Sequence, residues 1–104
     1  MPNEIEIKRK KKLAEAVRVY GPLPESVASA ILEGSDVCDV CGGHGRTVVE
    51  HDHETGQVRG MACMRCNALC AVIERRMAAS GVTLPAEGGS RILAYLRRAK
   101  GLEA

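Results

Sequence analysis

Two Cys-x-x-Cys pairs constrain the fold of this 104-residue chain more than any other feature of its sequence. The first pair is Cys38 and Cys41, the second is Cys63 and Cys66, and the segment between the pairs is long enough for a hairpin that brings them together. A tetrahedral Zn²⁺ takes four thiolates, and one Cys-x-x-Cys turn lets two of them reach the same ion. We therefore expect a structural zinc site at these four cysteines.

Other uses of these cysteines fit the sequence less well. A redox Cys-x-x-Cys normally occurs once and near a βαβ pattern, and iron–sulfur sites usually have cysteines that cluster more closely. The fifth cysteine, Cys70, falls on the helix expected after Cys66, where a small buried apolar side chain is the simplest interpretation. His44 lies in the knuckle loop and is expected to be solvated, because four cysteines already satisfy the ion.

The length of the chain fits one domain, and a core of this size often needs a metal or a partner for support. Residues 1–20 contain no apolar segment typical of a secretory signal, so we expect a reducing, intracellular compartment. No apolar stretch approaches the roughly 20 residues that span a bilayer. We expect a basic, disordered N-terminal segment at 1–12 and one zinc-containing domain at 13–104, with its core motif at 38–80.

Charge is distributed unevenly along the chain. Residues 1–20 carry six Lys and Arg against three acids, residues 91–104 carry four against one, and residues 21–90 carry five against nine. Basic ends of this kind attract polyanions, so nucleic acid is a plausible partner. With Tyr20 and Tyr95 as its two aromatic residues, the chain lacks the stacking platforms of single-strand binders. The expected contacts to the DNA backbone come from Lys8, Arg9, Lys10, Lys11, Lys12 and Arg59.

Hydrophobic spacing and turn residues predict a small α+β fold. Helices are expected at 13–20, 24–33 and 90–100, together with one that follows Cys66 and ends before Gly81. Two short strands, 46–50 and 57–61, are expected to pair through a turn at 54–56. In the helix after Cys66 the predicted apolar positions are Leu69, Val72, Ile73 and Met77. In the last helix the basic face is expected to carry Arg91, Arg97, Arg98 and Lys100.

A polar quartet, Glu50-His51-Asp52-His53, ends the first expected strand between the two Cys pairs. A carboxylate and the amide of Asn67, which lies near the start of the following helix, are oxygen ligands suited to Mg²⁺. A neutral imidazole beside such an ion can remove a proton from attacking water. Adjacent strand residues face opposite ways, so Glu50 and His51 serve one centre only if the strand ends or bulges there.

These motifs carry a resemblance to a known family. Cys38-x-x-Cys41, Val49-Glu-His-Asp-His53, Thr55-Gly56, Val58-Arg-Gly60 and Cys63-x-x-Cys66-Asn67 resemble the recombination endonuclease VII family of phages, within the wider HNH, ββα-metal or His-Me finger nucleases. The match is dense over residues 38–67 and looser in the last helix. The resemblance implies a small zinc-stabilised ββα-metal nuclease domain flanked by helices.

The resemblance also implies an activity and its residues. It implies an intracellular phage-type DNA endonuclease, acting in the host cell as a homodimer on duplex or branched DNA, including Holliday junctions. Zn²⁺ would be bound by the four cysteines, and a catalytic Mg²⁺ or Mn²⁺ by Glu50 and Asn67. His51 would be the general base, with His53 assisting at the scissile phosphate. The family usually has Asp where this chain has Glu50. The alternative function is a non-catalytic zinc module that binds nucleic acid or a protein.

Overall fold

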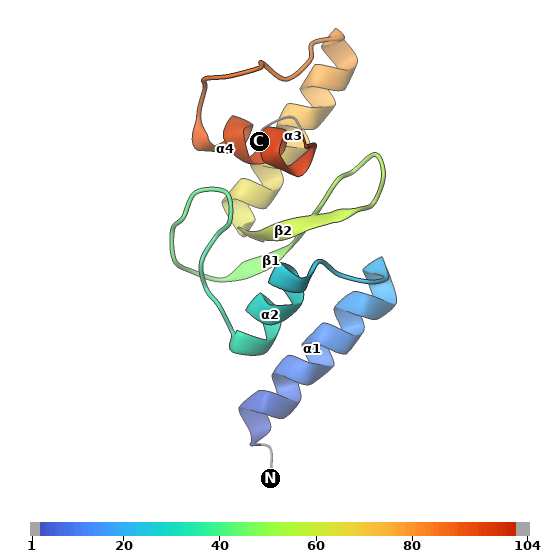
Figure 1. Cartoon of the computed structure of the whole chain (residues 1–104), viewed down its shortest axis with the longest axis vertical. Helices are drawn as coiled ribbons and strands as arrows, with labels where there is room; N and C mark the ends of the chain where they lie inside the picture. Colours follow the sequence, from blue (N-terminus) through green and yellow to red (C-terminus); the bar gives the residue numbers. More distant parts are fainter. Residues whose placement is uncertain (1–2, 102–104) are drawn as a thin grey trace.

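The computed structural model describes residues 3–101, which form four helices around one two-stranded antiparallel sheet. Figure 1 shows α1 and α2 at one end, the hairpin in the middle and α3 and α4 at the other end of a body measuring 52 × 26 × 25 Å. The expected α+β class is confirmed. The elements are α1 (Glu4–Tyr20), α2 (Glu25–Glu33), β1 (Thr47–His51), β2 (Val58–Cys63), α3 (Met64–Ser80) and α4 (Arg91–Ala99).

Helix α1 begins well before the expected start at residue 13. The side chain of Asn3 caps its first turn by accepting a hydrogen bond of 2.9 Å from the backbone N–H of Glu6. Glu4 and Glu6 in that turn favour the positive end of the helix dipole. The basic run therefore lies inside a capped helix, and the expectation of an unstructured stretch up to residue 12 is wrong from Asn3 onward. Residues 1 and 2 lie outside the described part.

The other helices end close to the expected residues. Helix α2 follows Pro24 and stops at Gly34, whose left-handed φ of 66° suits a glycine. Helix α3 starts at Met64, after Cys63, whose Sγ accepts a bond of 3.5 Å from the N–H of Cys66. Ser90 occupies the expected cap position of α4 but makes no side-chain capping bond. The second cysteine pair is thus held by the first turn of α3.

The expected hairpin contains a bulge beside the polar quartet. Glu50 pairs with Gly60 and His51 pairs with Val58, so Arg59 is the extra residue on β2. Because the extra residue is on β2, β1 keeps its alternation, and Glu50 and His51 point to opposite sides of the sheet. The bulge also brings Val58 and Met61 to one side, where both join a core with α1 and α2.

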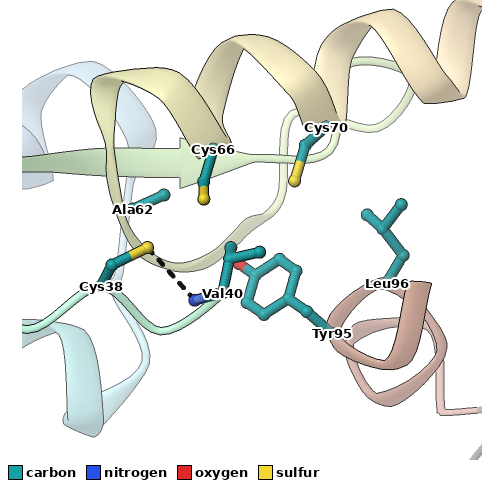
Figure 2. Packing of buried hydrophobic residues seen from close by; sticks show 7 residues of the cluster. All are labelled: Cys38, Val40, Ala62, Cys66, Cys70, Tyr95 and Leu96. Carbon is teal, nitrogen blue, oxygen red and sulfur yellow. Dashed lines mark hydrogen bonds between the residues drawn. The ribbon is translucent and has the colours of Figure 1, made fainter. Parts of the chain in front are cut away.

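Two hydrophobic cores flank the hairpin. One contains Ala16, Val27 and Ile31 together with β2, and the other packs α3 and α4 against the cysteine knuckle. Figure 2 shows this second core, where Cys70 and Tyr95 point toward each other from α3 and α4. No helix among the residues described is both long and apolar enough to cross a bilayer.

Two helix faces differ from the expected ones. In α3 the fully buried residues are Cys66 and Cys70, and Ile73 packs against the same core as expected, whereas Leu69 and Val72 are exposed. In α4 Arg97 is buried instead of lying on a basic surface face. Its guanidinium donates to the carbonyl of Gly88 at 2.7 Å, which fixes the loop before α4.

Candidate functional site

The four cysteines of the two Cys-x-x-Cys pairs form one cluster. Their Sγ atoms all lie within 4.8 Å of one another, with Cys38 and Cys66 buried and Cys41 and Cys63 half-buried. Tetrahedral zinc with Zn–S bonds of about 2.3 Å needs sulfur atoms roughly 3.8 Å apart, so this arrangement fits Zn²⁺. The sequence-based prediction of a four-cysteine metal site is confirmed.

Backbone N–H groups point at the sulfur atoms in both knuckle turns. The N–H of Val40 lies 3.4 Å from Sγ of Cys38 (Figure 2), and the N–H of Gly43 lies 3.4 Å from Sγ of Cys41. Burial raises the pKa of the Cys38 thiol, but hydrogen bonds from the backbone of Cys41, Cys63 and Val40 outweigh it and lower the pKa to about 7. The first turn therefore favours the thiolate of Cys38, the form that binds zinc, whereas burial and the neighbouring cysteines raise the pKa of the Cys66 thiol.

Two residues near the cluster behave as the sequence suggests. Cys70 is fully buried in the core beside Tyr95, and burial, with Glu50 nearby, raises the pKa of its thiol to about 12. It is a neutral apolar side chain and no part of the sulfur cluster. His44 has a side chain that is 73% exposed and pairs with Asp36 at 3.0 Å in the knuckle loop.

Glu50 is fully buried, and both oxygens of its carboxylate contact Arg59. Nε of Arg59 donates to Oε2 at 2.9 Å and Nη2 donates to Oε1 at 2.6 Å, which is a bidentate ion pair. The Arg59 side chain is only 4% exposed. Burial lowers the pKa of Arg59, but its hydrogen bonds to Glu74 and Glu50 raise it above the ordinary value, so the guanidinium stays charged.

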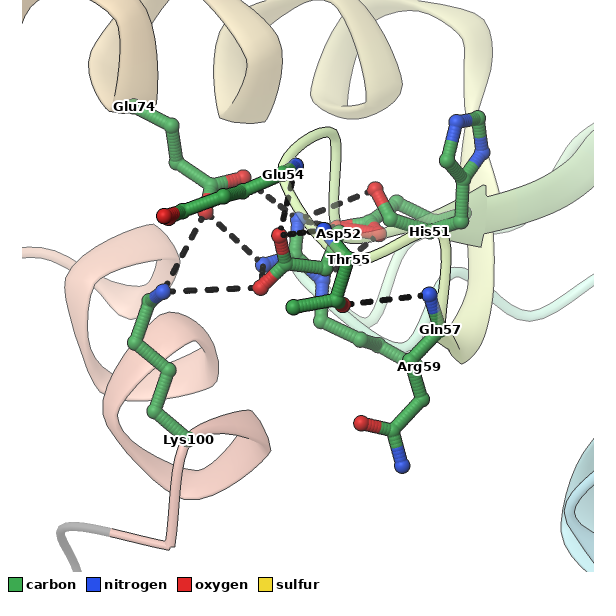
Figure 3. A network of polar contacts seen from close by, with 9 residues as sticks. His51, Asp52, Glu54, Thr55, Gln57, Arg59, Glu74 and Lys100 are labelled. Carbon is green, nitrogen blue, oxygen red and sulfur yellow. Dashed lines mark hydrogen bonds and ion pairs between the residues drawn. The ribbon is translucent and has the colours of Figure 1, made fainter. Parts of the chain in front are cut away.

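Arg59 contacts two further carboxylates, which come from different elements. Glu74 of α3 accepts bonds of 2.6 and 3.0 Å from the same guanidinium, and Asp52 lies 3.6 Å from it. Lys100 lies 3.5 Å from Asp52 and 3.6 Å from Glu74. Figure 3 shows this network between the hairpin turn, α3 and the end of α4. These five residues (Glu50, Asp52, Arg59, Glu74 and Lys100) are called the Arg59 cluster below.

Asp52 also organises the turn after β1. Its Oδ1 accepts bonds from the N–H groups of Glu54 at 2.8 Å and Thr55 at 3.1 Å. Burial raises the pKa of Asp52, but these bonds and the charges of Lys100 and Arg59 outweigh it, so the pKa lies below its ordinary value. Asp52 is therefore ionised at neutral pH, and it ties the turn that carries His53 to the Arg59 cluster.

His51 and His53 lie together, on the side of β1 opposite Glu50. Their ring centroids are 4.7 Å apart, and the ring of Tyr20, at the end of α1, lies 5.4 Å from that of His51. The Nδ1 atom of His51 is buried and has no hydrogen-bond partner among the residues described. Figure 3 shows the His51 ring pointing away from the Arg59 guanidinium. The structure thus brings the two histidines together, separately from Glu50.

Asn67 is half-buried at the end of the first turn of α3. Residues three and seven positions apart share one helix face, so Asn67 lies on the same side of α3 as Cys70 and Glu74. Helix α3 packs against both strands. Asn67 lies on the stripe of α3 whose next turns reach the core and the Arg59 cluster.

His53 lines an open groove of about 680 Å³ beside this site. The groove runs between α3 and the segment that follows it, and its polar rim includes Glu74, Arg75 and Lys100. Of the two histidines, His53 is thus the one reached from this groove.

The donor groups at Glu50 and Asn67 have the chemistry of a Mg²⁺ site, but their arrangement does not fit one as it stands. Both oxygens of Glu50 already contact a cation, the guanidinium of Arg59, and the carboxylate is inaccessible to solvent. Glu50 and His51 also face opposite sides of the sheet. A catalytic ion held by Glu50 next to His51 would require Arg59 to release at least one carboxylate oxygen.

The residues expected to contact DNA have different surroundings. Arg59 is enclosed by carboxylates, and its guanidinium is not presented to a phosphate in this arrangement. The Arg9 guanidinium packs over Gly34 at the C-terminal end of α2, where a cation is favourable. The four lysines of the run are exposed; three of them, at i, i+3 and i+4, share one face of α1, and Lys10 lies on another. They are Lys8, Lys10, Lys11 and Lys12.

Glu74 and Lys100 take part in the site although the sequence analysis gave them no role there. Glu74 carries a recognisable signal, because it follows Cys70 by four residues and Asn67 by seven, on the inner face of α3. Lys100 comes from the far end of the chain, and no local pattern predicts that it meets Asp52.

Comparison with known proteins gives one finding. The sequence model of the family described as recombination endonuclease VII matches residues 11–81, which include both cysteine pairs, the hairpin and α3. No curated protein and no solved structure gives a significant match.

Proposed function

The chain belongs to the recombination endonuclease VII family, and we propose that it is a metal-dependent DNA endonuclease that hydrolyses phosphodiester bonds in branched DNA, with His51 as its general base. The single observation that carries this proposal is the Nδ1 atom of His51, which is buried, without a hydrogen-bond partner among the described residues, and at the end of β1 beside His53. Buried polar atoms nearly always have a partner, so an orphaned one calls for an explanation such as a bound water, a bound ion or a catalytic role, and the Tyr95 hydroxyl shares this property.

The chemistry proposed for His51 is proton removal from the attacking water. As the water oxygen forms a bond to phosphorus, the imidazole of His51 takes its proton, and the bond from phosphorus to the leaving sugar oxygen breaks. The leaving oxygen then receives a proton from solvent. The role proposed for His53 is to donate a hydrogen bond to the phosphate, which its ring distance of 4.7 Å from His51 and its place at the open groove support.

Dependence on Mg²⁺ or Mn²⁺ is part of this proposal. A divalent ion bound at such a site would stabilise charge on the phosphate and on the leaving oxygen. The residues proposed to bind it are Glu50 and Asn67, on the strength of their oxygen ligands and of the family to which the chain belongs. Glu50 is longer by one methylene than the Asp usual in the family. Because both of its oxygens contact Arg59, an ion can bind Glu50 only after Arg59 releases at least one of them.

The proposed substrate is duplex or branched DNA, including Holliday junctions, cut by a homodimer inside the host cell of a phage. The exposed lysines of α1 can neutralise the phosphates of the DNA backbone. Arg9 and Arg59 are also proposed contacts, but each would first have to leave its present partners. Ile5 and Val19, exposed apolar side chains on the same side of α1, offer contacts for a second copy.

A cleavage panel tests the proposal. Zinc-loaded protein is incubated with linear, nicked, single-stranded and four-way-junction DNA, with Mg²⁺ or with a chelator weak enough to leave the cysteine site loaded. We expect Mg²⁺-dependent nicks, most rapid on the junction. Cleavage at equal rates by wild type and His51→Ala would exclude His51 as the base.

The rival function is a non-catalytic zinc module. The cysteine cluster alone supports it equally well, since a structural metal site serves either role. It assigns no purpose to the orphaned Nδ1 of His51. Tight binding to branched DNA without cleavage under any metal condition favours this rival.

A further inference from the structure

Arg59 contacts both carboxylate oxygens of Glu50, the two atoms through which that residue could bind a metal ion. Two nitrogen atoms of the guanidinium contact the two oxygens of Glu50 at 2.6 and 2.9 Å, and two contact the oxygens of Glu74 at 2.6 and 3.0 Å. A further bond of 3.3 Å runs to the backbone carbonyl of His51. Arg59 thus joins the proposed metal ligand, the proposed base and α3 through one side chain.

The charges of the Arg59 cluster leave little attraction for a divalent cation. Three carboxylates, of Glu50, Asp52 and Glu74, face two cations, Arg59 and Lys100, so the formal net charge is −1. Buried charges need partners, and a guanidinium cannot lose its proton at accessible pH. A divalent ion can therefore bind Glu50 only if Arg59 stays paired with another carboxylate of the cluster.

Glu74 and Asp52 are the carboxylates able to retain Arg59. Glu74 already makes a two-point contact with the guanidinium, and Asp52 lies 3.6 Å from it. Neither requires the backbone of β2 to move for Arg59 to remain paired. We propose that Arg59 and a divalent cation compete for Glu50, and that Glu74 is the positioning residue that retains Arg59 when the cation binds.

This proposal rests on the proposed function, because it concerns the carboxylate that the endonuclease would use for its ion. It also gives a physical consequence to the glutamate at position 50. The bidentate contact with Arg59 depends on the reach of the longer side chain, since an aspartate is shorter by one methylene. Glu50→Asp should therefore weaken the competing contact while keeping the charge.

Mn²⁺ binding to the zinc-loaded protein measures the competition directly, with free Mn²⁺ followed by electron paramagnetic resonance. Arg59→Lys keeps the charge but lacks the two-point contact, so we expect Mn²⁺ to bind about tenfold more tightly, the equivalent of one charge-assisted hydrogen bond. Glu50→Asp should also tighten binding. Glu74→Gln should weaken it by a similar factor, because Arg59 then depends on Glu50. Glu50→Gln should remove this Mn²⁺ site.

Each result bears on the proposal. Equal or weaker Mn²⁺ binding by Arg59→Lys overturns it, and so does Mn²⁺ binding that Glu50→Gln leaves unchanged. The double variant Arg59→Gln/Glu74→Gln preserves the net charge of the cluster and replaces Arg59→Lys if that variant fails to fold. The double variant should also bind Mn²⁺ more tightly than wild type. Equal or weaker binding by it contradicts the proposal. Circular dichroism and a zinc content of one ion per chain establish folding.

Junction cleavage by the same preparations separates the two proposals. If wild type cuts DNA but the Mn²⁺ affinities do not follow the expected order, only the competition is wrong. If the affinities follow the order but no DNA is cut, the proposed function fails and the competition stands.

Discussion

Replacing Arg59 by methionine should destabilise the domain far more than the same change at a surface arginine. Arg59→Met keeps most of the side-chain volume but removes the charge that faces Glu50, Glu74 and Asp52. The matched control is Arg18→Met, because Arg18 pairs with Glu15 at the surface and its side chain is 72% exposed. The two variants differ in burial while the type of ion pair is the same.

The expected magnitude follows from burial. Removing one partner of a buried ion pair costs about 3–5 kcal/mol, because the remaining charge loses its compensation. A domain of this size has an unfolding free energy of about 5–15 kcal/mol, so the change removes a large part of it. For Arg18→Met we expect no measurable change, since exposed pairs contribute little. The double variant Arg59→Met/Glu50→Gln should be more stable than Arg59→Met alone, because one of the carboxylates that lost its partner is then neutral.

Urea unfolding followed by circular dichroism measures both variants, with free zinc fixed at one concentration because metal binding shifts apparent stability. At a slope of about 1.5 kcal/mol/M, Arg59→Met should lower the midpoint by about 2–3 M. A loss below about 1 kcal/mol, or equal losses for the two arginine variants, refutes the reasoning that the Arg59 cluster is a buried, mutually dependent set of charges.

Three further predictions concern the metal site, the bulge and the turn. Cys63→Ser, or removal of zinc by a strong chelator, should unfold the domain, and circular dichroism that stays native after verified zinc loss would contradict this. Gly60→Ala should lower the free energy of unfolding by about 1–3 kcal/mol, because the added Cβ would lie 2.8 Å from Oδ2 of Asp39 and 2.9 Å from the Tyr95 hydroxyl. An unchanged midpoint of urea unfolding would show that these two side chains move aside without cost. The pKa of Asp52 is lower in the folded state than its ordinary value of about 3.9, so the ionised carboxylate stabilises the fold at pH values above 3.9. This stabilisation is lost as the pH falls through the folded-state pKa. Wild type should therefore exceed Asp52→Asn in stability most at neutral pH, with a difference that disappears in acid, and a difference independent of pH would argue against it.

The sequence was sufficient to predict the elements that depend on local signals. The spacing of four cysteines predicted the metal cluster, and the β-prone segments around Thr55-Gly56 predicted the hairpin. The bulge beside Glu50 was also expected, as a condition for Glu50 and His51 to share a centre. It lies on β2 instead of β1, however, so it leaves the alternation of β1 intact and does not bring the two side chains together.

The errors come from interactions that local patterns do not contain. The start of α1 depends on an asparagine cap and two acids, which extend the helix through a basic run that looked unstructured. Arg97 is buried because a loop carbonyl accepts its charge, and hydropathy alone cannot reveal such a partner. The acids that surround Arg59 come from three segments, so the Val-Arg-Gly motif alone could not predict its present partners. Long-range pairing decided each of these positions.

The rate of junction cleavage by His51→Ala tests the central claim most directly. Under single-turnover conditions with Mg²⁺, loss of a general base should slow the cleavage step by about 10²–10⁴-fold. His44→Ala is the matched control, because His44 lies exposed in the knuckle loop, paired with Asp36. The account predicts that His44→Ala cuts at the wild-type rate and that added imidazole partly restores cleavage by His51→Ala. Cleavage by His51→Ala at the wild-type rate would contradict it.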